Sequence, residues 1–204
     1  MNTSKDNVGL IILAAGASTR MGKPKQLLPF GATTLIGHAI KAGVDSDCEP
    51  VVVVLGARSE LIKKTIKDNS VNIAVNNSWQ EGMGSSLRVG LKRILALQTV
   101  KAVVVMVCDQ PSVDSQLLND IISCFDKWDP TGVACNYGDI VGVPALFGAA
   151  MFSELLDISG DKGARALLMK YKDQFKLVSF PEGAMDIDTP NDYKHLTTKF
   201  KDKN

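Results

Sequence analysis

The sequence predicts an α/β fold of three layers, with a mostly parallel sheet between two layers of helices. Three observations lead to this prediction: short apolar runs alternate with stretches of helical spacing, the runs are rich in β-branched residues, and they show little polar alternation. Strands that are apolar on both sides are buried on both faces, which is typical of a parallel sheet covered by helices. The strand–helix order also favours an open sheet with right-handed crossovers.

Strands and helices alternate regularly as far as about residue 125. The predicted strands are Val8–Leu13, Pro50–Leu55, Val71–Val75 and Ala102–Val107, and the predicted helices are Thr33–Ala42, Ser59–Ile66, Ser85–Leu97 and Ser115–Phe125. Hydroxyl side chains are favoured at the first position of a helix because they accept hydrogen bonds from free backbone N–H groups. We therefore expect Ser115, and either Ser85 or Ser86, to act as N-caps.

The pattern becomes less regular in the last third of the chain. It predicts short strands at Gly132–Asn136 and Val143–Phe147, helices around Ala149–Leu156 and Gly163–Tyr171, a strand at Phe175–Ser179, and a last helix opened by Pro190. There is no internal repeat, linker or low-complexity tract. We expect residues 1–204 to form a single domain, with a polar tail at 197–204 that frays.

The composition is that of an ordinary globular protein. Hydrophobic residues make up 45% and charged residues 22% of the 204 positions, which excludes wholesale disorder and fibrous structure. A net charge of +1 gives no electrostatic reason to expect a nucleic-acid or membrane partner. No apolar run approaches the ~20 residues that span a bilayer, and the polar N-terminus has no signal-peptide core. We expect a cytoplasmic protein.

Cysteine and histidine usage narrows the kind of metal site that is expected. The sequence has four widely spaced cysteines and two histidines, which are Cys48, Cys108, Cys124, Cys135, His38 and His195. Without a Cys-x-x-Cys pair, neither a structural zinc site nor a disulfide framework is expected, and any metal would be held by oxygen ligands. Cys108 lies in an apolar run and is expected to be buried. His195 lies in a polar stretch and is expected to be solvated.

A loop rich in small residues follows the first predicted strand. In open α/β sheets, ligands bind at the carboxyl ends of strands, so Leu13–Lys25 is the expected binding loop. The small side chains of Ala14–Ala17 let backbone N–H groups approach an anion. Arg20 and Lys25 add positive charge that suits a triphosphate better than a sugar hydroxyl. The spacing is neither that of a P-loop nor that of a dinucleotide fingerprint. The alternative is a tight turn with solvated cations.

Two acidic segments follow predicted strands. Asp109 comes directly after the fourth strand and faces the same crevice as the first loop. A nucleotide-bound Mg²⁺ needs only one or two protein carboxylates, and Asp109 suits the first of these. The alternative is that Asp109 only caps a helix. The second segment, Asp186–Asp192, precedes the last helix, where Thr189 or Asp188 is expected to be the cap.

Small residues and two hydroxyls open the third predicted helix, in the stretch Glu81–Leu87. Free N–H groups and the helix dipole at such a start favour an anion or a carbonyl oxygen. The alternative is a capping motif that binds no ligand.

The string L-A-A-G-x-S-x-R-M-G-x-x-K at positions 13–25 resembles the signature of the molybdopterin nucleotidyltransferases and, more widely, of nucleotidyltransferases with the nucleotide-diphospho-sugar transferase fold. The resemblance implies a Rossmann-like, three-layer sheet of that type. It also implies that the loop wraps a nucleoside triphosphate and that Arg20 and Lys25 neutralise its phosphates as catalytic residues. The implied nucleotide contacts in this loop are Leu13, Ala14, Ala15, Gly16, Ser18, Arg20 and Lys25.

Other strings resemble the cytidylyltransferase branch of that family. C-D-Q-P and D-I-D-T-P-x-D imply that Asp109 and Asp188 hold Mg²⁺, with Asp109 also catalytic and with Asp186 and Asp192 structural. G-M-G-S-S-L lies near the nucleotide base in that branch. It implies base contacts by Gly82, Ser85 and Ser86 and favours CTP over GTP.

The C-terminal half carries two strings, G-x-P-x-L-F and G-D-x-G-A-R, that surround the acceptor in the same branch. They imply acceptor contacts by Gly142, Pro144, Lys162 and Arg165, with the two cations suited to a terminal phosphate. An alternative is that Arg165 only pairs with Asp161. The chain departs from many relatives at 137–143, where an acid and apolar residues replace their arginines and histidine. The nature of the acceptor is therefore left open.

The resemblance extends from about residue 8 to about residue 195 and implies a Mg²⁺-dependent nucleotidyltransferase. Its N-terminal half would bind CTP, and its C-terminal half would bind molybdopterin, whose phosphate would receive CMP as diphosphate leaves. The product would pass to a molybdoenzyme or its maturation factor. One alternative is another phosphorylated acceptor, such as a sugar phosphate. Another is a non-catalytic molybdopterin-binding maturation factor, which would have no need of Lys25, Asp109 and Asp188 together.

Overall fold

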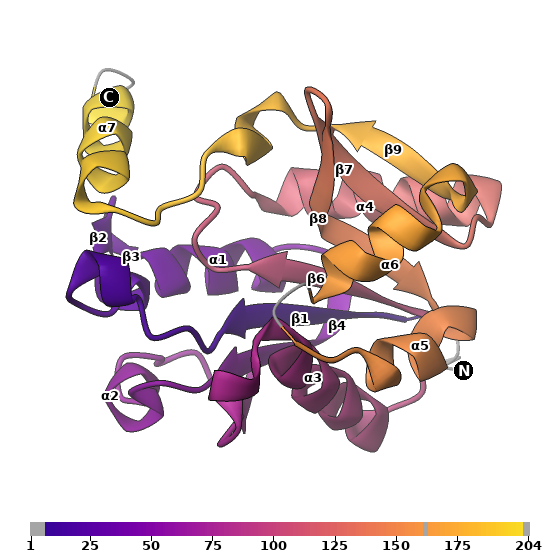
Figure 1. The fold of residues 1–204 in the computed structure, drawn as a ribbon, viewed down its shortest axis with the longest axis horizontal. Coiled ribbons are helices and arrows are strands. Elements are labelled where there is room, and N and C mark those ends of the chain that lie inside the picture. The colour runs from indigo at the N-terminus through magenta and orange to yellow at the C-terminus, as the bar shows by residue number, and fades with distance from the viewer. Residues whose placement is uncertain (1–6, 161–162, 202–204) are drawn as a thin grey trace.

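The computed structural model describes residues 7–160 and 163–201, and its central feature is a seven-stranded sheet (Figure 1). The strand order is β5-β4-β1-β6-β8-β7-β9, and β8 is antiparallel to both of its neighbours while the other pairs are parallel. The strands are β1 (Val8–Ala14), β4 (Cys48–Leu55), β5 (Asn72–Val75), β6 (Ala102–Val107), β7 (Gly132–Tyr137), β8 (Ile140–Gly148) and β9 (Phe175–Ser179). The predicted mostly parallel sheet is confirmed.

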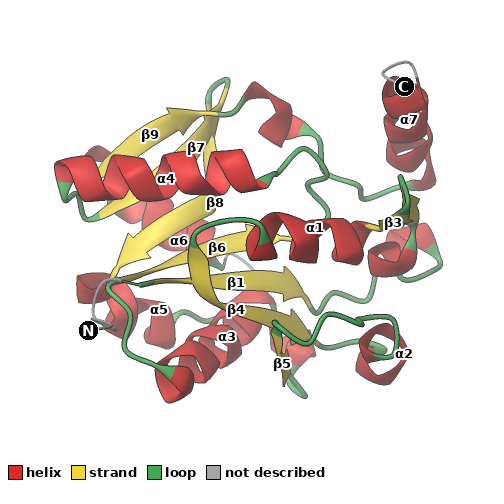
Figure 2. Cartoon of the chain, turned by 180° about the vertical axis from the view of Figure 1, so that it is seen from behind, coloured by secondary structure: helices red, strands yellow, loops and turns green. Residues whose placement is uncertain are grey.

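Helices cover both faces of the sheet, so the predicted three layers are confirmed (Figures 1 and 2). One apolar core joins the sheet to α1 and α4, and a second joins it to α3, α5 and α6. The helices are α1 (Leu35–Val44), α2 (Ser59–Lys63), α3 (Met83–Leu97), α4 (Ser115–Trp128), α5 (Phe152–Asp157), α6 (Ala164–Lys170) and α7 (Pro190–Lys201). Short 3₁₀ turns lie at Thr19–Met21, Lys25–Leu27, Trp79–Glu81, Ala149–Met151, Lys172–Gln174 and Pro181–Ala184.

The central strand β1 shows why the sequence carries an uninterrupted apolar run. Leu10 and Ile12 pack into the core under α1, whereas Ile11 and Leu13 pack into the core under α3. Both helices approach the strand closely at a glycine. A Cβ at Gly43 of α1 would lie 2.5 Å from a Leu10 methyl, and one at Gly90 of α3 would lie 2.6 Å from an Ile11 methyl. A larger residue at either position would require the Leu10 or Ile11 side chain to move.

The N-cap predictions for α3 and α4 are wrong. The cap of α4 is Asp114, whose carboxylate accepts a hydrogen bond from the Leu117 N–H at 2.9 Å, and Ser115 is the first helical residue. Helix α3 begins at Met83, before both serines, after a Gly82 with a φ of +98°. A positive φ of this kind is accessible to glycine without strain, so the chain turns into the helix two residues earlier than the hydroxyls indicate.

The C-terminal helix packs on a small hairpin that sequence reasoning did not identify, formed by β2 (Pro29–Phe30) and β3 (Thr33–Thr34). Figure 1 shows α7 beside this hairpin. The Tyr193 hydroxyl donates to the Pro29 carbonyl at 2.7 Å, and Leu196 is fully buried in a third apolar cluster with Leu28. We expected a frayed tail at 197–204; α7 includes the part of it up to Lys201, and residues 202–204 lie outside the described residues.

The parallel strands all end at one edge of the sheet, where they position the candidate site. The loop after β1, the residues after β4, β5 and β6, and the segment after β9 meet at this edge because parallel strands share a direction. None of the helices in the described ranges is long and apolar enough to cross a membrane.

Candidate active site

The loop after β1 is held in shape by its own hydrogen bonds. Ser18 adopts a left-handed conformation with a φ of +56°, and its hydroxyl accepts from the Lys25 N–H at 3.1 Å. Gln26 is 1% exposed, and its amide nitrogen donates to the carbonyls of Ala14 at 3.0 Å and Gly16 at 2.9 Å. Sequence reasoning missed Gln26. Its only signal was a polar side chain beside the predicted phosphate-binding lysine.

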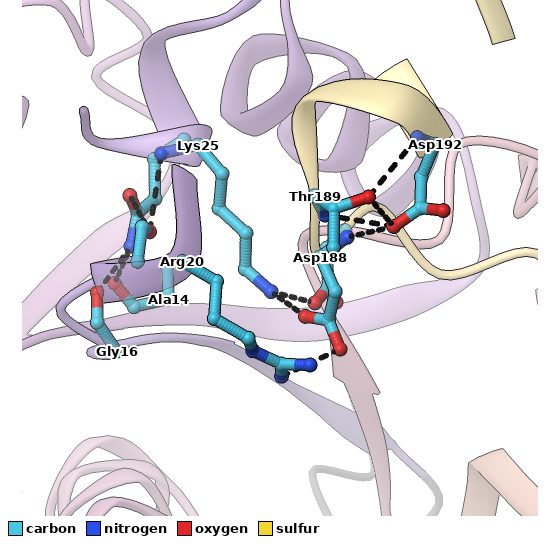
Figure 3. Close-up of polar contacts among 10 residues, drawn as sticks. Ala14, Gly16, Arg20, Lys25, Asp188, Thr189 and Asp192 are labelled. Atoms are coloured by element: carbon cyan, nitrogen blue, oxygen red, sulfur yellow. Dashed lines mark hydrogen bonds and ion pairs between the residues drawn. The ribbon is translucent and has the colours of Figure 1, made fainter. Parts of the chain in front are cut away.

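Lys25 lies between the two predicted metal-binding carboxylates. Its ammonium group contacts the Asp109 carboxylate and lies 3.0 Å from Asp188 Oδ1, while Arg20 Nη2 lies 2.8 Å from Asp188 Oδ2. Figure 3 shows the Lys25 and Arg20 side chains reaching toward Asp188 from the opposite side of the crevice. The structure therefore brings together four predicted residues from three distant segments of the chain.

The opposite charges in this cluster stabilise one another's ionised forms. Burial alone would lower the pKa of Lys25, but attraction and hydrogen bonds to Asp109 and Asp188 outweigh it and hold the pKa above its ordinary value. Burial acts against ionisation of Asp188, but Lys25 and Arg20 hold its pKa below the ordinary value. Asp186 behaves oppositely, because burial and then the neighbouring Asp109 carboxylate raise its pKa. Lys25 and Asp188 are therefore charged near neutral pH.

The second acidic segment is tied to the first by backbone and side-chain contacts. The Ile187 N–H donates to the Asp109 carbonyl at 3.1 Å, which fixes Asp188 one residue further on. The Asp192 carboxylate accepts from the N–H of Thr189 at 2.7 Å and of Asp188 at 3.2 Å, and the Thr189 hydroxyl lies at the start of α7 (Figure 3). Thr189 and Asp192 thus form the helix cap, and Asp192 has the structural place that we expected.

The carboxylates of Asp109 and Asp188 suit a hard divalent cation. Both reach the same Lys25 ammonium group, so they converge on one point that already accommodates a positive charge. Among the described residues no group of three His, Cys, Asp or Glu side chains is arranged to hold a metal. Asp109 and Asp188 could supply two ligands to a cation at this point, and phosphate oxygens and water could supply the rest, as is usual for nucleotide-bound Mg²⁺.

A cavity of about 450 Å³ separates the first loop from the start of α3. Of the predicted nucleotide contacts, its wall includes Leu13, Ala14, Ala15, Gly16, Lys25, Gly82 and Ser86. Ser85 is not on this wall, since its hydroxyl donates to the Gly82 carbonyl at 2.8 Å inside its own turn. Trp79 and Asp109 also line the wall, and sequence reasoning did not single out Trp79.

A second cavity of about 560 Å³ lies on the other side of the charged cluster and shares Lys25 and Asp109 with the first. Gly142 and Arg165 line it, as predicted for acceptor contacts. Pro144 is buried outside its wall, and Lys162 and the Asp161 proposed to pair with Arg165 lie outside the described residues. The remaining wall combines apolar side chains, among them Val141, Val143 and Leu168, with the polar Gln110 and the charged Arg20, Asp186 and Asp188.

Tyr137, at the end of β7, also lines the second cavity and was not predicted to do so. Its hydroxyl lies against the backbone of Gly142, where a Cβ would collide with it. Burial and the nearby Asp186 carboxylate raise the pKa of Tyr137, so its hydroxyl stays protonated. Its sequence neighbours Gly138 and Asp139 indicated only a turn.

The chain matches a family model described as a MobA-like NTP transferase domain over residues 10–175. The chain belongs to this family. The chain is also similar to curated proteins with different names. The chain is 30% identical over 165 residues to nicotine blue oxidoreductase of Paenarthrobacter nicotinovorans, covering 78% of this chain and 79% of that protein. It is 34% identical over 119 residues to the bifunctional protein GlmU of Cereibacter sphaeroides, covering 56% of this chain but only 26% of GlmU.

Solved structures agree with the MobA-like family assignment. Rv0371c of Mycobacterium tuberculosis H37Rv superposes with a TM-score of 0.84 and 29% identity, over 96% of this chain and 98% of that one. A manganese complex of Rv0371c superposes with a TM-score of 0.78 and 27% identity, over 94% and 98% of the two chains. The molybdopterin-guanine dinucleotide biosynthesis protein A of Archaeoglobus fulgidus, at 14% identity and a TM-score of 0.70 over 96% and 100%, shares the fold. The expected nucleotidyltransferase family and its Rossmann-like fold are confirmed.

Proposed function

We propose that this MobA-like protein transfers CMP from CTP to the phosphate of a molybdopterin-type acceptor and releases diphosphate, with Mg²⁺ as the cation. The observation that carries the proposal is the cluster of Lys25, Asp109 and Asp188 at the junction of two cavities, with Arg20 at its rim. A reaction between two bound molecules needs both reacting groups at one point, and this cluster lies where such a point would be.

The first cavity would hold the nucleoside triphosphate. Backbone N–H groups over residues 14–17 can approach phosphate oxygens because no side chain there is larger than a methyl group. Arg20 and Lys25 would neutralise the charge that develops on the leaving diphosphate. Such preorganised charges are usually the largest contribution to catalysis of this kind.

Asp109 and Asp188 would hold the Mg²⁺. When bound, the cation supplies neutralisation of the triphosphate and polarisation of its phosphoryl oxygens. The protein's part is to keep the two carboxylates together. It does so through the Ile187 to Asp109 backbone hydrogen bond and through the cap formed by Asp192.

The acceptor phosphate would attack the α-phosphorus from the second cavity, opposite to the diphosphate. One phosphorus–oxygen bond forms to the acceptor while the bond to the β-phosphate bridging oxygen breaks, and diphosphate takes the electron pair. The nucleophile is already an anion, so no strong base is required. In keeping with this, the described residues that line the two cavities include no histidine.

One part of the second cavity's wall suits a flat heterocycle as the acceptor. Val141, Val143 and Leu168 offer no polar partner to a sugar hydroxyl, although Gln110 and Asp186 elsewhere on the wall do. The Tyr137 ring and these apolar side chains suit a flat heterocycle, and Arg165 suits its phosphate. A sugar phosphate therefore remains the alternative acceptor that must be tested.

Two other activities deserve a direct comparison. The relative named nicotine blue oxidoreductase makes a redox activity the second candidate. A non-catalytic molybdopterin carrier is the third. The ion cluster favours triphosphate chemistry over both, because neither hydride transfer nor simple carriage requires two carboxylates beside a loop suited to phosphate.

The deciding experiment measures diphosphate release with CTP, GTP, UTP and ATP, using molybdopterin and a hexose phosphate as separate acceptors. We expect turnover with CTP and molybdopterin, with a 10- to 100-fold preference for CTP over GTP, about what one unmet buried polar contact provides. Equal or better use of GTP would overturn the cytidylyl assignment alone. No diphosphate release with any pair, together with reduction of a quinonoid dye by a nicotinamide cofactor, would establish the redox candidate instead.

A further inference from the structure

Asn76 lies directly after β5 and is 3% exposed. Its backbone N–H donates to the Leu55 carbonyl at 2.7 Å, and its side-chain oxygen accepts from the Ser78 N–H at 2.9 Å. A backbone N–H can only donate, so the oxygen and nitrogen of this amide are distinguished by their partners. The amide nitrogen must therefore face α3.

The two hydrogens of that nitrogen reach two neighbouring serines. Asn76 Nδ2 lies 2.7 Å from Ser85 Oγ and 3.0 Å from Ser86 Oγ, and both serines are 3% exposed. Each serine oxygen is thereby fixed as an acceptor toward Asn76. The two hydroxyls differ in whether the protein offers an acceptor for the proton that each of them donates.

Ser85 uses its proton inside the protein. Its hydroxyl donates to the Gly82 carbonyl at 2.8 Å, with the Ser78 carbonyl at 3.1 Å as a second acceptor. For the Ser86 hydroxyl, the described residues provide no such acceptor, and Ser86 lines the first cavity whereas Ser85 does not. A buried donor without an acceptor is unfavourable, so the Ser86 proton is available to an acceptor atom placed in the cavity.

We propose that Asn76 is a positioning residue that fixes Ser86 as a hydrogen-bond donor to the nucleobase. The inference rests on the proposed function, because it requires that the first cavity bind a nucleotide. A base that presents acceptors there, such as the carbonyl O2 and ring N3 of cytosine, satisfies the Ser86 donor. Guanine could meet that donor only through an acceptor such as O6 or N7, because its N1–H and amino group are donors themselves. Selection between the bases would thus begin at Asn76, which lies outside the cavity wall.

The first test compares Ser86→Ala with Ser85→Ala. The two residues are neighbours on α3, are equally buried and bind the same amide, so they form a matched pair. We expect Ser86→Ala to raise KM for CTP about tenfold with kcat nearly unchanged, and to reduce the preference for CTP over GTP by a similar factor. We expect Ser85→Ala to lower the melting temperature and to leave KM and the preference within twofold.

The second test uses Asn76→Asp, which replaces the hydrogen-bond donor that faces the two serines with an acceptor. Both carboxylate oxygens accept, so the Ser86 proton would turn to residue 76 and away from the cavity. We expect the same rise in KM for CTP as in Ser86→Ala, and no further rise in the double variant, since the two changes remove one contact. A structural role for Asn76 would instead give additive losses. If the buried carboxylate prevents Asn76→Asp from folding, the comparison of Ser86→Ala with Ser85→Ala decides the inference by itself. Neither serine variant buries a charge.

Calorimetry of CTP with Mg²⁺ separates failure of this inference from failure of the proposed function. Binding that only Ser86→Ala weakens supports the inference even where no turnover is seen. Equal weakening by both serine variants, or by neither, overturns the inference and leaves the nucleotidyltransferase proposal intact. Absence of nucleotide binding to the wild-type protein overturns both.

Discussion

The two cavities that meet at Lys25 are built differently. The first is lined by the buried Gln26, whose amide donates to the Ala14 and Gly16 carbonyls, and by the buried Ser86, which accepts from the Asn76 amide outside the wall. The wall of the second carries more charge, since Arg20, Arg165, Asp186 and Asp188 line it beside Lys25 and Asp109, and the Arg165 side chain is exposed. A side chain held by buried hydrogen bonds keeps one direction, whereas an exposed side chain can adapt to its ligand. The common chemistry of the family would then reside in the first cavity, and the choice of acceptor in the second.

The strongest test of this comparison removes the charge that both cavities share. Asp109→Asn keeps the shape of the side chain but removes the charge that a divalent cation requires, so we expect turnover at ordinary Mg²⁺ to fall by about 10³-fold or more. Direct Mn²⁺ binding should weaken in parallel, while the melting temperature stays close to that of the wild type. Asp126→Asn, which removes only a surface pair with Lys101, is the control and should leave turnover unchanged. Normal turnover in Asp109→Asn would make this residue a turn residue only.

The next largest effect is expected at the lysine between the carboxylates. Lys25→Ala removes stabilisation of the developing phosphate charge, and we expect kcat to fall roughly 10²- to 10³-fold with a much smaller effect on folding. Lys41→Ala breaks the exposed pair with Asp45 and serves as the control. A Lys25→Ala protein that melts much earlier, or that reacts at the normal rate, would show that the contact with Asp109 and Asp188 is structural.

A smaller effect is expected at the second cavity, and it should change only the KM for the acceptor. Arg165→Ala should raise KM for the acceptor about tenfold and leave KM for CTP unchanged, because one charge-assisted contact to a phosphate is lost in the second cavity alone. Lys170→Ala, on the same helix but paired with Glu154 at the surface, should change neither constant. A change in KM for CTP would mean that the two cavities are not separate sites.

The smallest effect concerns the frame that holds Asp188. Hydrogen bonds from the Thr189 side chain and backbone hold the pKa of Asp192 below its ordinary value of 3.8. The group therefore stabilises the fold at neutral pH, and this contribution is lost as the pH falls below about 3.8 through the lowered folded-state pKa. Asp192→Ala should lower the melting temperature by about 2–4 °C at pH 7, which corresponds to one helix cap. The difference from wild type should vanish in melting curves recorded below that pH, and a difference that persists there would contradict this role.

Sequence reasoning predicted more of the first cavity than of the second. The first loop was predicted because its small residues and cations are contiguous, so a local pattern carries the chemistry. Asp109 was predicted to lie near this loop because it comes just after the end of a buried strand. Gln26 and Tyr137 were missed, since a polar or aromatic residue next to a loop has no distinct local signature. Pro144 was assigned to the acceptor from its motif, yet its side chain lies outside the cavity wall.

The sequence by itself determined the order of strands and helices, the burial of the central strands on both faces and the place of the first loop. These follow from local apolar patterns and from small residues, which act within a few positions of the chain. Only the tertiary structure decided that Lys25 meets Asp188 across 163 positions, that β8 runs against its neighbours, and that Ser86 faces the cavity while Ser85 does not. The physical reason is that a buried polar side chain takes its direction from its hydrogen-bond partners, and the packing of distant segments supplies those partners.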